Sequence, residues 1–76
     1  MRRSRDRIIS EILEVCLDGA NKTKIVYKVN LNFVSASRYL EVLIKHGFIE
    51  MSDGKYKTKE KGKQFLNSYQ DIQDLI

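Results

Sequence analysis

Residues 22–50 read KTKIVYKVNLNFVSASRYLEVLIKHGFIE. Apolar side chains recur at helical spacing over residues 22–29 and again over 33–46, and the residues between them are typical of a tight turn. Asn32 is a good N-cap for the second helix, because its side-chain oxygen can accept a hydrogen bond from an unpaired backbone N–H. Gly47 can end that helix in a left-handed conformation. This stretch therefore predicts two helices joined by a short turn.

The helix predicted over residues 33–46 has two chemically different faces. One face carries apolar side chains at i, i+3/i+4 and i+7 spacing, namely Phe33, Ala36, Leu40, Leu43 and Ile44. The opposite face carries side chains that have no packing role in a monomer, namely Val34, Ser35, Arg38, Glu41, Val42 and Lys45, with Ser37 and Tyr39 on its flanks. The first face should attach the helix to the domain, and the second is free to bind a partner.

The sequence after this helix, residues 48–58, predicts a β-hairpin with a turn at Asp53-Gly54. Lys55 and Lys57 alternate with Tyr56, so the lysines should point to one side and the tyrosine to the other. The lysines could contact phosphate or the minor groove, or they could protect an edge strand from pairing with other chains.

Further helices are predicted on either side of this region. Residues 5–18 carry apolar side chains over more than half of the helix circumference, which is wider than one core requires. The excess surface should contact another element or another chain. In the helix predicted over 59–76, a/d spacing relates Phe65, Tyr69, Ile72 and Ile76, with Leu75 beside this seam and Leu66 directed back to the domain.

Composition limits how the chain can stabilise itself. Its 76 residues form one small domain, which buries only roughly 60% of the surface that the unfolded chain exposes. Cys16 is the only cysteine and His46 the only histidine, so neither a disulfide nor a metal cluster can supplement the core. Oligomerisation is the remaining supplement. A single cysteine also favours a reducing, cytoplasmic setting.

Charge is distributed unevenly along the chain. Residues 1–63 contain all 14 lysines and arginines and eight of the ten acids, which gives +6, whereas residues 64–76 carry −2. This division suggests a part that binds a polyanion joined to a part that associates, although a basic but inert surface would look the same. No apolar run approaches the roughly 20 residues of a membrane span, so we expect a soluble protein without a membrane partner.

Two helices joined by a short turn and followed by a basic hairpin are the arrangement of a winged helix-turn-helix. The chain resembles the small archaeal winged-helix proteins, a family of transcriptional regulators and chromatin-associated DNA binders. The resemblance is carried by the segments KTKIVYKVNLNF, YLEVLIKHGFIE and DGKYKTKEKGKQFL. It implies a mostly α fold with a small hairpin, in which residues 1–4 form a basic arm, 5–58 the winged domain and 59–76 a C-terminal helix. Some members dimerise through such a helix as an antiparallel coiled coil.

The helix over 33–46 is the one able to enter a major groove, with the hairpin over 48–58 as the wing. Candidate DNA-binding residues lie on its outer face, on the hairpin, at the start of the preceding helix and in the arm: Arg2, Arg3, Arg5, Lys22, Thr23, Lys24, Val34, Ser35, Ser37, Arg38, Tyr39, Val42, Lys45, Lys55 and Lys57. Arg38 is the best candidate for base readout, because its guanidinium can pair with guanine O6 and N7.

Structural explanations exist for several of these candidates. Arg38 and Lys45 could each form an ion pair with Glu41. The two serines could bond backbone N–H groups early in the helix. The arginines at the N-terminus could form a loose arm that reaches DNA, or a disordered basic terminus. These alternatives stay open in the sequence.

We expect a homodimer that presents two recognition helices to double-stranded DNA as a transcriptional regulator or a nucleoid-associated protein. Its interface should include Ile9, Leu13, Leu17, Phe65, Tyr69, Ile72, Leu75 and Ile76. The alternative is a protein–protein adaptor that does not bind DNA, since winged helices also serve as interaction modules. RNA is a weaker third option, because no aromatic sheet is expected. We expect no catalytic residues, no cofactor and no metal.

Overall fold

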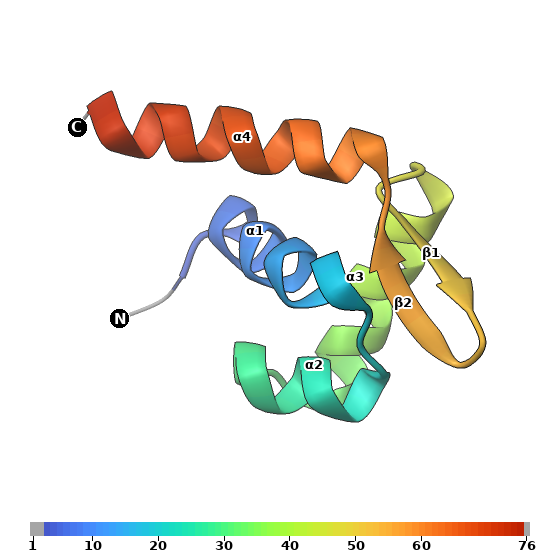
Figure 1. Ribbon diagram of the computed structural model, residues 1–76. Helices are drawn as coiled ribbons and strands as arrows, with labels where there is room; N and C mark the ends of the chain where they lie inside the picture. Colours follow the sequence, from blue (N-terminus) through green and yellow to red (C-terminus); the bar gives the residue numbers. More distant parts are fainter. Residues whose placement is uncertain (1–2, 76) are drawn as a thin grey trace.

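The computed structural model describes residues 3–75 as a group of helices with a two-stranded hairpin at one side (Figure 1). The elements in chain order are α1 (Arg5–Val15), the 3₁₀ turn η1 (Cys16–Asp18), α2 (Lys22–Val29), α3 (Phe33–Lys45), β1 (Ile49–Ser52), β2 (Lys55–Thr58) and α4 (Glu60–Leu75). This order confirms the mostly α fold with a small hairpin. Two residues assigned above, Arg2 in the arm and Ile76 in the dimer interface, lie outside the described residues.

Local hydrogen bonds set the boundaries of the two central helices. The side chains of Asn21 and Asn32 cap α2 and α3, and each accepts a hydrogen bond from the backbone N–H three residues later, at 2.8 and 2.7 Å. Asn30 ends α2 in the left-handed conformation, with φ of 60°. Gly47 follows α3 with φ of 79°, as its sequence position predicted. The turn between the helices is therefore encoded by asparagines on both sides.

One hydrophobic core lies between the helices and the hairpin, and every element except α4 contributes a buried hydrophobic side chain to it. Its members are Ile12, Leu13, Cys16, Ala20, Ile25, Val29, Leu40, Leu43, Ile49 and Tyr56. Tyr56 points into this core while its neighbours Lys55 and Lys57 are exposed, which confirms the predicted alternation on β2.

The hairpin is attached to the helices on its β2 side. Ala20 and Tyr56 exchange two backbone hydrogen bonds, of 3.0 and 2.7 Å, so β2 lies between β1 and the segment that joins α1 to α2. The buried hydroxyl of Thr58 donates to the carbonyl oxygen of Leu13 at 2.6 Å. These bonds hold the hairpin in a fixed position relative to α1.

The last helix, α4, runs antiparallel to α1 and continues past it toward the C-terminus (Figure 1). Phe65 and Leu66 pack against the core from its first half, and the inward direction of Leu66 was predicted. Gly62 is buried where α4 crosses the hairpin, and a Cβ atom there would lie 2.6 Å from the carbonyl oxygen of Phe48. Within residues 3–75, no helix is long and apolar enough to cross a membrane.

Two residues of α3 that we expected in the core are exposed. Phe33 is 54% and Ile44 42% accessible, whereas Ala36, Leu40 and Leu43 are buried. At about 100° per residue, Phe33 and Ile44 lie roughly 50–70° around the helix from the centre of the buried stripe. Both residues are displaced to the same side, and the neighbouring elements cover only the stripe itself, so the prediction was wrong at this edge of the apolar face.

Candidate nucleic-acid interface

The outer face of α3 is open to solvent along the length of the helix. Val34, Arg38, Glu41, Val42 and Lys45 are exposed on it, and three other candidate residues on its flanks are half-buried, namely Ser35, Ser37 and Tyr39. This placement follows the predicted wheel, because the buried stripe lies on the opposite side of the helix.

Arg38 does not form the ion pair that was the structural alternative for it. Within residues 3–75, the only ion pairs join Arg3 and Arg7 to Glu11. Glu41 is therefore bonded neither to Arg38 nor to Lys45. A guanidinium on an exposed helix face without a carboxylate partner is free to bind an external anion or a base edge.

The start of α2 lies beside this face and is tied to it. The ammonium of Lys22 donates to the hydroxyl of Ser37 at 3.0 Å, which links the first residue of α2 to the flank of α3. Thr23 and Lys24 are exposed at the same helix end. A helix N-terminus with lysines offers positive charge and backbone N–H groups to a phosphate.

The hairpin adds a second basic edge. Lys55 and Lys57 both lie on the exposed face of β2, opposite the buried Tyr56. The strands are joined at Asp53 and Gly54, both with positive φ, as expected for a two-residue hairpin turn. Basic side chains are thus exposed on the wing as well as at the start of α2.

The arginines near the N-terminus have different environments. Arg3 forms an ion pair with Glu11 and donates from Nη2 to the carbonyl oxygen of Asn30 at 3.2 Å. The expectation of a loose arm therefore does not hold for Arg3, which fastens the chain start to the turn between α2 and α3. Arg5, the first residue of α1, is exposed.

A shallow depression of about 460 Å³ separates the start of α1 from α3. It is lined by Arg5, Ile9, Ser35, Arg38, Tyr39 and Val42. The depression brings five candidate DNA-binding residues together, and it also contains Ile9, which we had assigned to the dimer interface. Sequence periodicity could not show this, because 17 residues, 16–32, separate the two helices.

Comparison with known proteins identifies the family of this arrangement. The family model described as winged helix-turn-helix matches residues 2–76. The chain belongs to the winged helix-turn-helix family. An uncharacterized protein of Methanocaldococcus jannaschii is 33% identical over 76 residues, which cover 99% of this chain and 78% of the relative. A second uncharacterized protein of that archaeon is 32% identical over 77 residues, and the alignment covers 36% of its length.

A solved structure shares the same winged helix-turn-helix fold. The crystal structure of Sso10a-2, a DNA-binding protein from Sulfolobus solfataricus, superposes with a TM-score of 0.82. Its sequence is 27% identical, and the match covers 96% of this chain and 81% of that one. These archaeal relatives confirm the resemblance that the sequence indicated, with α2 and α3 as the helix-turn-helix and β1–β2 as the wing.

The residues assigned to a dimer interface lie in different environments. Leu13 is fully buried in the core of its own chain, so its assignment to an interface was wrong. Phe65 contacts Phe48 edge to face and stacks on Tyr69, with both pairs of ring centroids 6.1 Å apart. Ile72 is 56% and Leu75 86% accessible on the part of α4 that continues past α1.

Cys16 should be chemically inert in the folded protein. It is fully buried, and this burial raises the pKa of its thiol to about 11, against a smaller opposite effect of the Lys24 charge. We expect iodoacetamide to alkylate Cys16 at pH 8 only after denaturation, with mass spectrometry as the measurement. Rapid alkylation of the native protein would contradict its buried position.

Within residues 3–75, no group of three histidine, cysteine or acidic side chains could hold a metal ion.

Proposed function

We propose that this protein binds double-stranded DNA with α3 in the major groove and the β1–β2 hairpin as the wing. The observation that carries the proposal is the exposed outer face of α3, on which Arg38 lacks a carboxylate partner. Family membership and the DNA-binding relative Sso10a-2 support it. The proposed activity is binding without catalysis, and it implies a location on the nucleoid.

Charge supports the same orientation. From Gly19 to Leu40, which includes α2 and most of α3, the chain contains four lysines and arginines and no acid. The DNA backbone carries one negative charge per roughly 1.7 Å of helix axis, so an acid-free segment of this kind is attracted to it. Lys22 and Lys24 at the start of α2 and Lys57 on β2 are proposed to contact phosphates.

Base readout is proposed for the outer face of α3. The major groove is about 12 Å wide and admits one α-helix. Arg38 can donate two hydrogen bonds to guanine, and Val34 and Val42 can contact thymine methyl groups. Both valine side chains are exposed and do not stabilise the monomer. Contact with thymine methyl groups would explain why apolar side chains are found there.

We further propose that two copies associate through α4. The support is the exposed pair Ile72 and Leu75 on the part of α4 that lies beyond α1. A dimer would bind two half-sites about one helical turn apart, roughly 34 Å. Such a dimer suits a transcriptional regulator or an architectural protein. Selection of bound duplexes from a random pool separates the two: an enriched sequence motif would favour a regulator, and the absence of one would favour an architectural protein.

The test is duplex binding by fluorescence anisotropy at several salt concentrations. We expect log K to fall linearly with log salt. Arg38→Ala should cost about 1–3 kcal/mol on a guanine-containing preferred site and relax the sequence preference, whereas Lys57→Ala should weaken all duplexes equally and lower the salt slope by about 1.

Two outcomes would reject duplex binding. One is an affinity that is undetectable at low salt, and the other is an affinity that does not change with salt. If Arg38→Ala and Lys57→Ala both leave duplex affinity unchanged, the face of α3 is a protein-binding surface, as in the adaptor alternative.

A further inference from the structure

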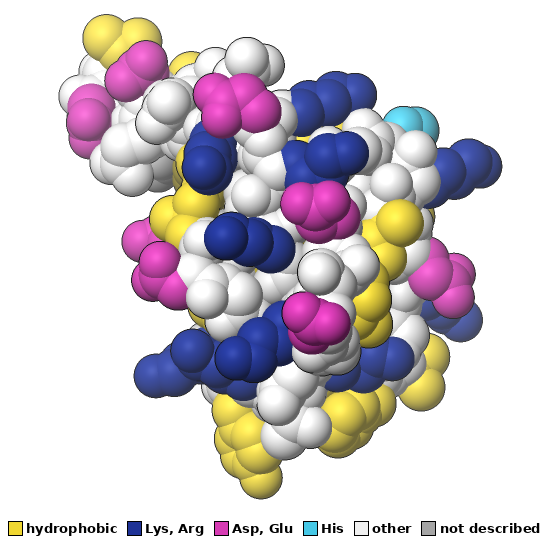
Figure 2. Space-filling model, turned by 45° about the vertical axis from the view of Figure 1, so that its right-hand side comes forward, with side chains coloured by type: hydrophobic (Ala, Val, Ile, Leu, Met, Phe, Trp, Pro, Cys, Tyr) yellow, Lys and Arg dark blue, Asp and Glu magenta, His cyan; other side chains and the backbone are white. Residues whose placement is uncertain are grey.

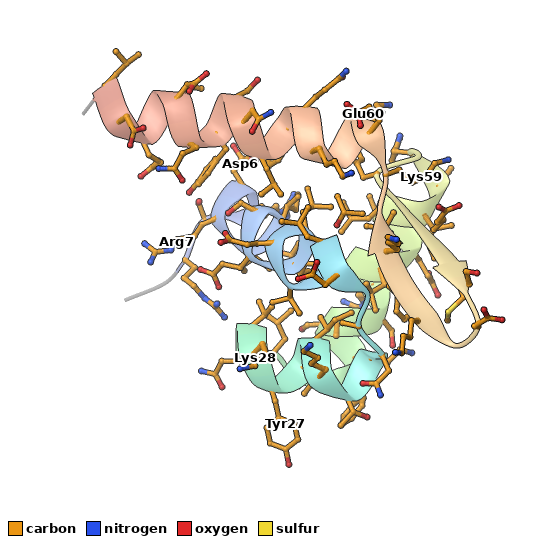
Figure 3. The ribbon with its side chains drawn as sticks, viewed as in Figure 1. Asp6, Arg7, Tyr27, Lys28, Lys59 and Glu60 are labelled. Carbon is orange, nitrogen blue, oxygen red and sulfur yellow. The ribbon has the colours of Figure 1, made fainter. Side chains whose placement is uncertain are left out.

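Two aromatic side chains of the helix-turn-helix are exposed without a structural reason. Tyr27 on α2 is 81% and Phe33 at the start of α3 is 54% accessible. Figure 3 shows Tyr27 pointing from α2 directly away from the rest of the molecule, with Lys28 next to it on the same helix. Its hydroxyl has no hydrogen-bond partner within residues 3–75. Large aromatic rings normally stabilise a fold by burial, and these two contribute little burial to this one.

The surroundings of Tyr27 are basic. Lys24 and Lys28 are exposed at the positions three before and one after it, and α2 contains no acid. Figure 2 shows hydrophobic side chains gathered at the end of the molecule where α2 lies, next to lysines and arginines. Exposed rings among cations suit a partner that has both flat apolar faces and negative charge.

We infer that this surface, formed by Lys24, Tyr27, Lys28 and Phe33, binds single-stranded DNA. Unpaired bases would stack on the two rings while the lysines contact the phosphates between them. Base–aromatic stacking needs no particular sequence, because every base has a π-face. In an intact duplex those faces are covered by neighbouring base pairs, so this activity differs from the proposed insertion of α3 into the major groove and goes beyond it.

The direction of Tyr27 strengthens the distinction from the recognition face. Residues Ile25 and Val29 of α2 are buried, and Tyr27 lies on the opposite side of that helix. The outer face of α3 lies opposite the buried residues of that helix, Ala36, Leu40 and Leu43. Tyr27 and Arg38 therefore belong to the exposed sides of two different helices. Substitutions at Tyr27 and at Arg38 should therefore affect different ligands.

The experiment compares an oligothymidine 20-mer with an abasic deoxyribose–phosphate chain of the same length, by fluorescence anisotropy at constant salt. The wild type should bind the oligothymidine at least fivefold more tightly than the abasic chain. Tyr27→Ala should weaken oligothymidine binding by about 5- to 150-fold, since stacking contributes about 1–3 kcal/mol per base. It should leave binding of the abasic chain and of duplex DNA within twofold of wild type.

Two matched variants complete the test. Tyr27→Phe keeps the ring and should keep wild-type affinity for the oligothymidine. The chain has no tryptophan, so Tyr27→Trp introduces a single reporter whose fluorescence should be quenched when bases stack on it. Because position 27 is exposed, all three variants should fold, and circular dichroism checks this.

The inference is overturned if Tyr27→Ala binds the oligothymidine as the wild type does, or if the abasic chain binds equally well. Failure to bind both the oligothymidine and the abasic chain would also overturn it. The surface would then be a candidate for binding a protein instead. Duplex binding is measured on the same samples. Its loss with oligothymidine binding retained would reject the proposed function and leave this inference standing.

Discussion

Replacing Gly62 with alanine should lower the free energy of unfolding by about 1–3 kcal/mol, the range for overpacking a close-packed site. An added Cβ would lie 2.6 Å from the carbonyl oxygen of Phe48 and 2.7 Å from Cγ2 of Thr58. The Phe48 carbonyl cannot easily move away, because it accepts a hydrogen bond from the backbone of Lys59 at 2.9 Å. Without the clash, alanine would stabilise a helix interior by about 1 kcal/mol relative to glycine. We expect the clash to outweigh this gain, so that the substitution destabilises the protein.

Urea denaturation measures this change in the free energy of unfolding. The protein concentration must be the same for all variants, because association would change the apparent stability. Asn67→Ala is the control, since it also adds helix preference, up to about 0.7 kcal/mol, but at an exposed position of α4. It should leave stability unchanged or slightly raised. Equal stability of Gly62→Ala and the wild type would mean that α4 does not approach the hairpin as closely as described.

Local rules made the helix-turn-helix predictable. Capping by Asn32 and the left-handed Gly47 depend on a few neighbouring residues, and both were correctly read from the sequence. The hairpin followed from the alternation around Tyr56. The exposure of Phe33 and Ile44 was not predictable, because a helical wheel gives the direction of a side chain but not the width of the surface that neighbouring elements cover.

Contacts between distant segments explain the other differences. The hydrogen bond from Arg3 to the carbonyl oxygen of Asn30 joins residues 27 positions apart, and no local pattern indicates it. Ile9 had been assigned to a dimer interface because α1 has a wide apolar surface, yet it faces α3 across the depression. In both cases the missing information was how α1 is oriented relative to the helix-turn-helix.

The aromatic surface on α2 was missed although the sequence contains a signal for it. Tyr27 lies opposite Ile25 and Val29 on the helical wheel, within a run of 22 residues, from Gly19 to Leu40, that lacks any acid. We had considered the stacking of bases only on an aromatic sheet. An aromatic residue on the polar side of a basic helix is the pattern that could have identified it.

The structure also narrows the proposed dimer interface on α4. Phe65 and Tyr69 stack on each other, and Phe65 packs against the core through Phe48, so much of their surface is used within the chain. Ile72 and Leu75 have no such neighbours on the part of α4 beyond α1. The association energy should therefore be concentrated in the last turns of the helix.

Ile72→Asp should convert the proposed dimer to monomers and lower duplex affinity by about 10²- to 10⁴-fold. Apposition of two copies would bury this side chain, and an unpaired carboxylate cannot be buried there without a large desolvation cost. Affinity falls because a dimer engages its second half-site as an intramolecular event, and a monomer loses that advantage. Sedimentation velocity measures the mass, and anisotropy with a two-site duplex measures the affinity.

Asn67→Asp is the control for charge, because it adds the same negative charge at an exposed position of α4 away from Ile72. It should remain dimeric and lose only the small affinity expected from one unit of charge. A duplex with a single half-site should bind the wild type and Ile72→Asp alike, because neither gains from a second contact. If the wild type sediments as a monomer at high micromolar concentration, the proposed dimer is rejected. The proposed binding of α3 in the major groove does not depend on that result and is tested by the salt dependence of duplex affinity.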